Sequence, residues 1–182
     1  MAADTVAPQR HWQAAEVRAL LADIADPEIP VISIGELGVL RDVLAPVAGD
    51  GRFEVVITPT YSGCPAIEQI ADDIHAALAV HQLSARITTR LAPAWTTDWL
   101  EPATLAKLRD YGIAAPAPGS AHALGGNLVQ FAKRNLRPAA DVCCPRCASI
   151  NTTPTSHFGS TACKALYRCL DCLEPFDYFK PY

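Results

Sequence analysis

Two C-x-x-C units, Cys144-Pro145-Arg146-Cys147 and Cys169-Leu170-Asp171-Cys172, place the strongest constraint on how this sequence can fold. Each unit lets two sulfur atoms reach one ion from a tight turn, and two such turns supply the tetrahedral set of four thiolates that zinc prefers. The 21 residues between the units slightly exceed the usual zinc-ribbon spacing, which a loop absorbs at little cost. We therefore expect a metal site at these four cysteines. Iron is the competing ion, because sites with four sulfurs also hold iron.

The segment 141–182, which carries these units, is too short to fold unaided. With about 40 residues it cannot bury enough apolar surface for a stable core, so we expect the metal to be structural. Four basic side chains stand against four acidic ones, which leaves no surplus of positive charge to bind phosphates. Aromatic side chains are dense instead, and a mostly neutral aromatic surface suits a protein partner rather than a nucleic acid.

Two further thiols belong to this segment. Cys143 adjoins an expected ligand and cannot easily share its turn geometry, so we expect it to be a bystander. Cys163 lies six residues before Cys169, and two interpretations of it stay open. It either packs inside the ribbon as a strand cysteine, or stands beside Lys164 as a second thiolate for transient metal or cluster transfer.

The composition limits the compartment and the partners. Seven cysteines, an odd count with paired C-x-x-C units, favour thiolate chemistry in a reducing compartment over a disulfide framework. Residues 1–10 lack the charged and then apolar pattern of a secretory signal, so a cytoplasmic location is expected. No window approaches the roughly 18 apolar residues of a membrane helix. The net charge of −4 argues against a general nucleic-acid binder.

Upstream of the cysteine units, hydrophobic spacing predicts six elements. Apolar residues at helical spacing predict helices at 11–25, 67–78 and 101–111, and runs with strand character predict strands at 39–44, 53–58 and 85–91. This order, α-β-β-α-β-α with antiparallel strands, predicts a small α+β domain followed by a C-terminal zinc-ribbon-like module. We expect the first domain at 11–113, a Pro- and Gly-rich linker at 114–140 and the ribbon at 141–182.

Cys64 lies between the second predicted strand and the second predicted helix. A cysteine at such a junction sits near the positive end of the helix, where thiolate is favoured over thiol. Pro65 suits the first helical position, and Gly63 keeps bulk away from the sulfur. The competing interpretation is a small buried hydrophobe that caps a core helix. A hydrolytic nucleophile is disfavoured, because no histidine in the sequence has the motif of an activating base.

Asp26-Pro27-Glu28-Ile29-Pro30 forms a rigid, extended entry to the loop before the first predicted strand. Its two carboxylates, Asp26 and Glu28, are the acidic groups of interest in this part of the chain. The simpler interpretation is a turn that an aspartate side chain stabilises by bonding to the backbone.

Several of these motifs together resemble a known family. Asp26-Pro27-Glu28-Ile29-Pro30, Glu36-Leu37-Gly38, Arg41-Asp42-Val43 and Thr58-Pro59-Thr60-Tyr61-Ser62-Gly63-Cys64-Pro65 are similar to the small α+β family that serves iron–sulfur cluster assembly. Trp95-Thr96-Thr97-Asp98-Trp99, the ribbon cysteines and the residues around Cys163 narrow the resemblance to the PaaD family. Members of that family are accessory subunits of the bacterial phenylacetyl-CoA 1,2-epoxidase (phenylacetate-CoA oxygenase) system.

This resemblance implies a maturation factor in aerobic phenylacetate catabolism that supports iron–sulfur or di-iron assembly, with the oxygenase and reductase subunits as partners. Cys64 matches the cysteine position on which the assembly family relies, and the ribbon cysteines match the PaaD metal motif. On this interpretation Cys64 holds or passes iron or a cluster, Asp26 and Glu28 orient that site, and Cys163 supplies a second thiol. Ala148 stands where glycine is usual after the first metal-binding turn.

We expect an accessory protein rather than a catalyst of ring oxidation. The sequence lacks the Glu-x-x-His pairs of a di-iron carboxylate oxygenase, and it has no Gly-rich nucleotide fingerprint. Two alternatives remain: a small electron carrier with iron in the ribbon, or an interaction subunit of the oxygenase. The sequence leaves a homodimer open.

Overall fold

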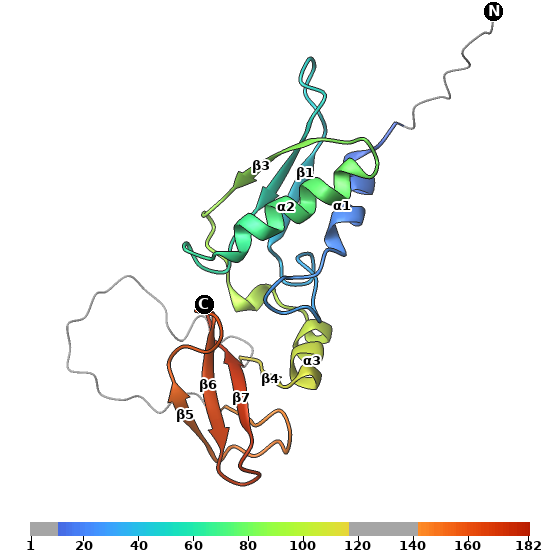
Figure 1. The fold of residues 1–182 in the computed structure, drawn as a ribbon. Helices are drawn as coiled ribbons and strands as arrows, with labels where there is room; N and C mark the ends of the chain where they lie inside the picture. Colours follow the sequence, from blue (N-terminus) through green and yellow to red (C-terminus); the bar gives the residue numbers. More distant parts are fainter. Residues whose placement is uncertain (1–10, 117–141) are drawn as a thin grey trace, which may run out of the picture.

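The structure, a computed structural model, describes residues 11–116 and 142–182. The predicted tail at 1–10 and the predicted linker from 117 to 140 lie outside the described residues. The first part contains α1 (Ala14–Ala22), β1 (Leu40–Leu44), β2 (Phe53–Ile57), α2 (Ala66–Ala79), β3 (Ala85–Thr89) and α3 (Pro102–Tyr111). All six predicted elements are present in the predicted order, with ends that differ by a few residues, and the α+β class is confirmed (Figure 1).

The first sheet has the strand order β1-β2-β3. β1 pairs with β2 in an antiparallel hairpin, whereas β2 and β3 run parallel. The expectation of antiparallel strands is therefore wrong for β3. The physical reason is α2, which follows β2 and returns the chain to the end of the sheet where β2 began, as a parallel connection requires. Figure 1 shows α2 lying across the sheet, with α1 beside it.

The second sheet is the ribbon, and it has the strand order β4-β7-β6-β5. Three of its strands come from the C-terminal part: β5 (Thr152–Ser156), β6 (Lys164–Cys169) and β7 (Pro175–Phe179). The fourth, β4 (Ile113–Ala114), follows α3 directly and pairs in parallel with β7. The domain boundary at 113 stays a prediction, yet a strand that begins there already belongs to the ribbon's sheet.

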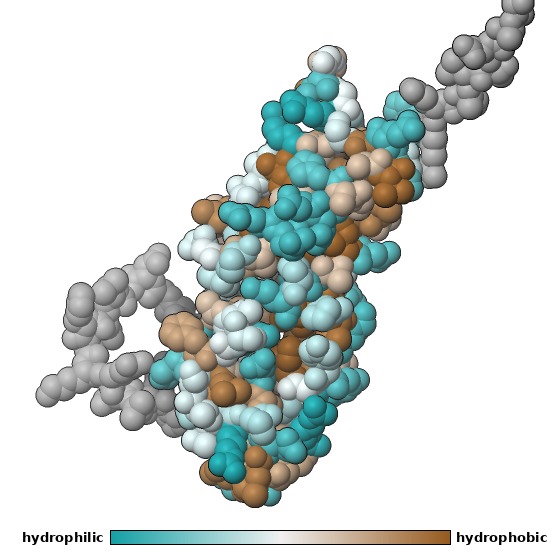
Figure 2. Space-filling model, viewed as in Figure 1, coloured by the Kyte–Doolittle hydropathy of each residue, from teal (hydrophilic) through white to brown (hydrophobic). Residues whose placement is uncertain are grey.

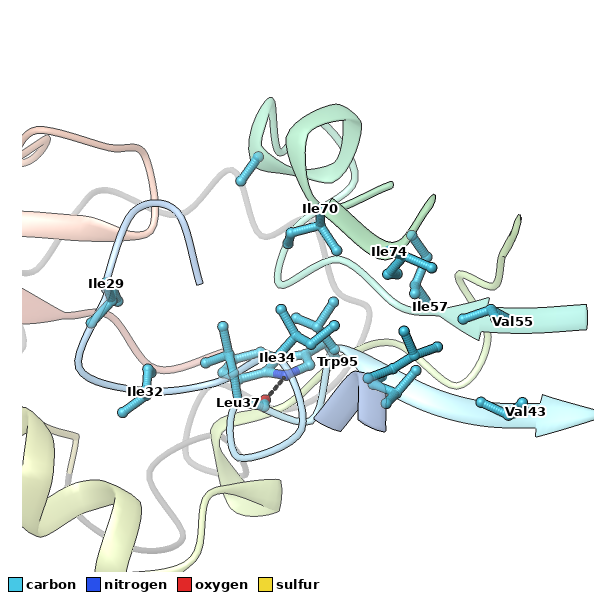
Figure 3. Close-up of a cluster of buried hydrophobic side chains, with 14 of the residues drawn as sticks. Ile29, Ile32, Ile34, Leu37, Val43, Val55, Ile57, Ile70, Ile74 and Trp95 are labelled. Atoms are coloured by element: carbon cyan, nitrogen blue, oxygen red, sulfur yellow. Dashed lines mark hydrogen bonds between the residues drawn. The ribbon is translucent and has the colours of Figure 1, made fainter. Parts of the chain in front are cut away.

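The main core lies between the first sheet and its helices, and it extends into the loop before β1. Figure 3 shows Ile29, Ile32, Ile34 and Leu37 of that loop in one cluster with side chains of the sheet and of α2. Cys163 and Phe179, which come from the ribbon, are buried in this same cluster. A second, smaller cluster lies within the ribbon and comprises Ala114, Val142, Cys144, Ala165, Tyr167, Cys169, Phe176 and Tyr178. The two modules thus share buried apolar surface.

Trp95 joins the two modules. Its indole Nε1–H donates a 2.8 Å hydrogen bond to the Leu37 carbonyl, drawn as a dashed line in Figure 3. The ring also makes edge-on contacts with Phe179 at 5.8 Å and Tyr182 at 6.2 Å between centroids. Such aromatic pairs add about 0.5–1.5 kcal/mol each beyond the area they bury. Thr96 strengthens the junction, because its hydroxyl donates to the main-chain oxygen of Tyr182 at 2.9 Å.

None of the helices that the structure describes combines the length and the apolarity needed to cross a membrane. Figure 2 shows apolar side chains in small groups among polar ones over the face in view. A surface of this kind is ordinary for a chain whose apolar core is internal.

Candidate functional site

The ribbon brings the four predicted metal-ligating cysteines together. The sulfur atoms of Cys144, Cys147, Cys169 and Cys172 all lie within 4.8 Å of one another, with 3.7 Å from Cys144 to Cys172 and 3.5 Å from Cys147 to Cys169. Sulfurs that lie about 2.3 Å from a tetrahedral zinc ion are about 3.8 Å apart. The arrangement therefore fits one metal ion. Cys143 is exposed and lies outside this group.

Backbone amides donate hydrogen bonds to the sulfur atoms, and hydrogen bonds between neighbouring side chains link the two metal-binding turns. The N–H of Arg146 donates to Cys144 at 3.4 Å, and the N–H of Cys172 donates to Cys169 at 3.5 Å. Asp171 accepts hydrogen bonds from Ser149 and from Asn151, and so links the two metal-binding turns. Bound metal would fold this small module by tying the two turns to one point.

Each metal-binding turn is followed by a non-glycine residue in the left-handed region. Ala148 has φ 61° and Leu173 has φ 66°. This conformation costs a residue with a Cβ atom about 1–2 kcal/mol. The departure from the usual glycine at 148 thus leaves the turn geometry intact and places a small strain on it.

Substituting Ala148→Gly is expected to stabilise the metal-loaded ribbon by about 0.5–1 kcal/mol, because glycine adopts the left-handed region without a Cβ clash. Denaturant unfolding of the metal-loaded chain measures the change. Ala165→Gly is the matched control, since Ala165 is buried in the extended strand β6 and its replacement should destabilise. Equal effects of the two substitutions would rule out strain at Ala148.

A second group of polar side chains lines a small, partly open cavity where the first domain meets the ribbon. The cavity has a volume of about 10 Å³, and its lining includes Asp26, Glu28, Cys64 and Cys163. The structure thus gathers all four residues that the sequence points to, and they come from three separate parts of the chain. The wall also includes Pro59, Thr60, Ile67 and Phe179.

One direct contact joins a loop carboxylate to the ribbon thiol. The sulfur of Cys163 donates to Oε2 of Glu28 at 3.7 Å and lies 3.0 Å from the hydroxyl oxygen of Thr161. Asp26 is buried, and its Oδ1 accepts from the backbone amides of Glu28 at 2.9 Å and Ile29 at 2.8 Å. Asp26 therefore stabilises the turn, as the simpler interpretation holds, and the same turn positions Glu28 at the cavity.

Burial keeps the two cavity thiols protonated. It raises the pKa of Cys64, against the lowering effect of the Ala66 backbone N–H, and nearby Glu28 raises that pKa further. It raises the pKa of Cys163 to about 11, where Thr161 opposes the change. The expectation that the helix start makes Cys64 a thiolate is therefore wrong, because desolvation outweighs the helix N-terminus. Cys64 itself is half-buried and precedes α2 by two residues.

Two further residues lie near the cavity: sequence reasoning gives Tyr61 no role and names Lys164 only as the neighbour of Cys163. Tyr61 lies beside Cys64, and burial followed by the charges of Cys64 and Glu28 raises its pKa to about 12. Lys164 is only 5% exposed, and its Nζ lies 3.4 Å from Oδ2 of Asp177. Burial has the largest effect on the pKa of Asp26 and raises it, whereas the charge of Lys164 acts in the opposite direction and lowers it. The apolar flank of Lys164 in the sequence, Ala162-Cys163 and Ala165-Leu166, is the signal that could have placed it in a buried strand.

These features define a two-part protein, in which an α+β domain is joined to a ribbon whose four cysteines fit one metal ion. Residues 14–88 match the family model of an iron–sulfur cluster assembly protein, and residues 130–180 match that of the PaaD zinc beta ribbon domain. Over 177 residues, 97% of this chain and 96% of its relative, the sequence is 48% identical to a subunit of the "Putative 1,2-phenylacetyl-CoA epoxidase" of Escherichia coli (strain K12). The chain belongs to the PaaD family.

Two solved structures each resemble about half of the chain. One is a domain of unknown function, DUF59, from Bacillus anthracis, with 24% identity, a TM-score of 0.46, and coverage of 52% of this chain and 90% of that one. The other is a conserved hypothetical protein of Thermotoga maritima, with 20% identity, a TM-score of 0.44, and coverage of 53% and 94%.

Proposed function

We propose that this protein is an accessory maturation factor for a phenylacetyl-CoA epoxidase complex in aerobic phenylacetate catabolism. It assists the assembly of iron–sulfur clusters or iron centres and is not itself catalytic on phenylacetyl-CoA. The naming of the relative as an epoxidase subunit and the match to the assembly family support this role. The oxygenase and reductase subunits of that complex are the proposed partners, and the reduced thiols that the role needs agree with a cytoplasmic location.

One observation carries the proposal: Asp26, Glu28, Cys64 and Cys163 line one cavity between the two modules. Thiols and carboxylates are ligands for iron, and a half-buried Cys64 remains within reach of a client protein. Because burial raises the pKa of both thiols, they bind iron only as the metal displaces their protons. Such a site binds metal less tightly than a preformed set of thiolates, which suits transfer better than storage.

The ribbon serves a different purpose in this proposal. Its four cysteines hold a structural ion, which we propose to be zinc because the matched family model describes a zinc ribbon. The ion contributes the folding free energy that the small ribbon core lacks. The ribbon in turn carries Cys163 to the cavity.

The test is to produce the epoxidase complex with the Cys64→Ser variant in a strain that lacks the wild-type protein. We expect the iron and acid-labile sulfide content of the purified complex to fall toward that of the deletion strain, because serine is a poor ligand for iron. The matched control is Cys143→Ser, an exposed cysteine outside both sites, which should leave the metal content unchanged. Full iron loading in the deletion strain would refute the maturation role, and full loading with Cys64→Ser alone would refute the role of that thiol.

A further inference from the structure

We propose that the interdomain cavity takes a single divalent metal ion rather than an assembled cluster, and that the ion binds first between the Cys163 sulfur and the Glu28 carboxylate. This inference rests on the proposed function, which leaves the choice between an ion and a cluster open. It also assigns the first metal contact to the ribbon thiol, Cys163, rather than to Cys64 at the helix start.

The volume of the cavity supports a single ion. A cavity of about 10 Å³ is at the lower limit for one water molecule. Even the smallest iron–sulfur cluster has two irons and two bridging sulfides, and it would have to displace the walls. Those walls include the fully buried side chains of Ile70 and Phe179, which belong to the main core and resist such displacement.

The distance between the two proposed ligands also fits one ion. The Cys163 sulfur lies 3.7 Å from Oε2 of Glu28. A tetrahedral ion with a sulfur at about 2.3 Å and an oxygen at about 2.1 Å holds those two atoms about 3.6 Å apart. The pair therefore already spans one edge of such a coordination shell, and the small shift needed is within the reach of a glutamate side chain.

The cavity offers fewer ligands than a metal ion needs to complete its coordination. Among residues 11–116 and 142–182, the four ribbon cysteines are the one group that brings three or more ligand atoms within 4.8 Å of one another. The cavity thus offers two ligands at coordination distance, with Cys64 and Asp26 farther off. Two protein ligands hold an ion weakly, and Cys64 can complete or receive the coordination as the ion moves on. The ion displaces the Cys163 proton to solvent when the sulfur–metal bond forms.

Charge favours a cation in this place. The carboxylates of Asp26 and Glu28 line the cavity, and the nearby buried cation, Lys164, is already paired with Asp177. The formal surplus is two negative charges, which one divalent ion neutralises.

The ligand pair crosses the interface between the modules, since Glu28 belongs to the loop after α1 and Cys163 immediately precedes β6. The binding pair therefore exists only when the ribbon is folded and docked. A structural metal in the ribbon is thus a precondition for binding cargo in the cavity.

Anaerobic titration of the zinc-loaded full chain with Co²⁺ tests this inference, because thiolate bonds to cobalt produce charge-transfer absorption. We expect one cobalt ion per chain while the ribbon keeps its zinc, which elemental analysis verifies. Cys163→Ala should abolish the absorption, and Glu28→Gln should weaken binding by about tenfold or more. Cys143→Ser, outside the cavity, should bind cobalt like the wild type. Thermal unfolding checks that Glu28→Gln, a substitution of nearly equal volume at a half-buried site, keeps the fold.

Cobalt binding that survives Cys163→Ala, or no cobalt binding by a chain that does accept a reconstituted iron–sulfur cluster, would overturn the single-ion inference. Neither result would bear on the maturation role, which is tested separately through the metal content of the epoxidase complex. Conversely, cobalt binding with the expected variant pattern, alongside a fully loaded epoxidase in the deletion strain, would support the ion site and refute the maturation role.

Discussion

Removing the metal from the four-cysteine centre is expected to unfold residues 142–182. Structural zinc contributes about 10–16 kcal/mol to the folding of small zinc modules at neutral pH, more than the ribbon's own core can replace. That core has eight buried residues, and two of them, Cys144 and Cys169, are themselves metal ligands in this scheme. A strong chelator, or Cys172→Ala, should therefore abolish the near-ultraviolet circular dichroism of the ribbon's tyrosines, with one zinc ion released per chain.

Cys143→Ala is the matched control for this experiment, because Cys143 adjoins the centre in sequence but lies outside the group of four sulfurs. It should bind zinc and unfold as the wild type does. A ribbon that keeps its tertiary signal after the metal has left would contradict a structural role. Release of iron together with visible absorption bands would instead favour the electron-carrier alternative.

Phe179→Ala is expected to destabilise the chain by about 3–5 kcal/mol, the usual cost of removing a fully buried aromatic side chain. Phe179 has 0% of its surface exposed and lies in the main core, although its strand belongs to the ribbon. Its loss removes the contact with Trp95 and one wall of the interdomain cavity. Denaturant unfolding measures the free energy, and alkylation of Cys64 should become faster because the cavity opens.

Phe176→Ala separates the coupling of the modules from simple loss of ribbon packing. Phe176 is also on β7 and is also buried, but it belongs to the second cluster. Its ring packs against that of Tyr167, with 5.9 Å between the ring centroids. We expect it to weaken the ribbon and to leave the alkylation rate of Cys64 near the wild-type value. Similar acceleration by both substitutions would mean that Phe179 has no special part in closing the cavity.

Local pattern was enough to predict most of the fold. Ile70, Ile74 and Leu78 recur at helical spacing, and all three are buried on the inner face of α2. The spacing of the ribbon cysteines likewise encodes their site, because each C-x-x-C turn fixes the positions of its own two sulfurs. In both cases the information lies within a few residues of sequence.

What could not be predicted depends on contacts between distant parts of the chain. The two-residue strand β4 is too short to leave a periodic signal, and it exists because β7 offers an edge for it. The parallel pairing of β2 with β3 depends on the path of α2. The pKa of Cys64 depends on burial and on the nearby charge of Glu28, which a helix start alone does not reveal. The convergence of Glu28 with Cys163, 135 residues apart, is of the same kind.

The pairing of β4 with β7 has a consequence for how such chains can vary. Ile113 and Ala114 hold the ribbon's sheet directly beside the end of α3, and Trp95 packs against Phe179 of the ribbon. The relative placement of the two modules is thus encoded in their mating surfaces. A substitution in those surfaces would shift the Cys163 thiol and the Glu28 carboxylate relative to each other without altering either residue.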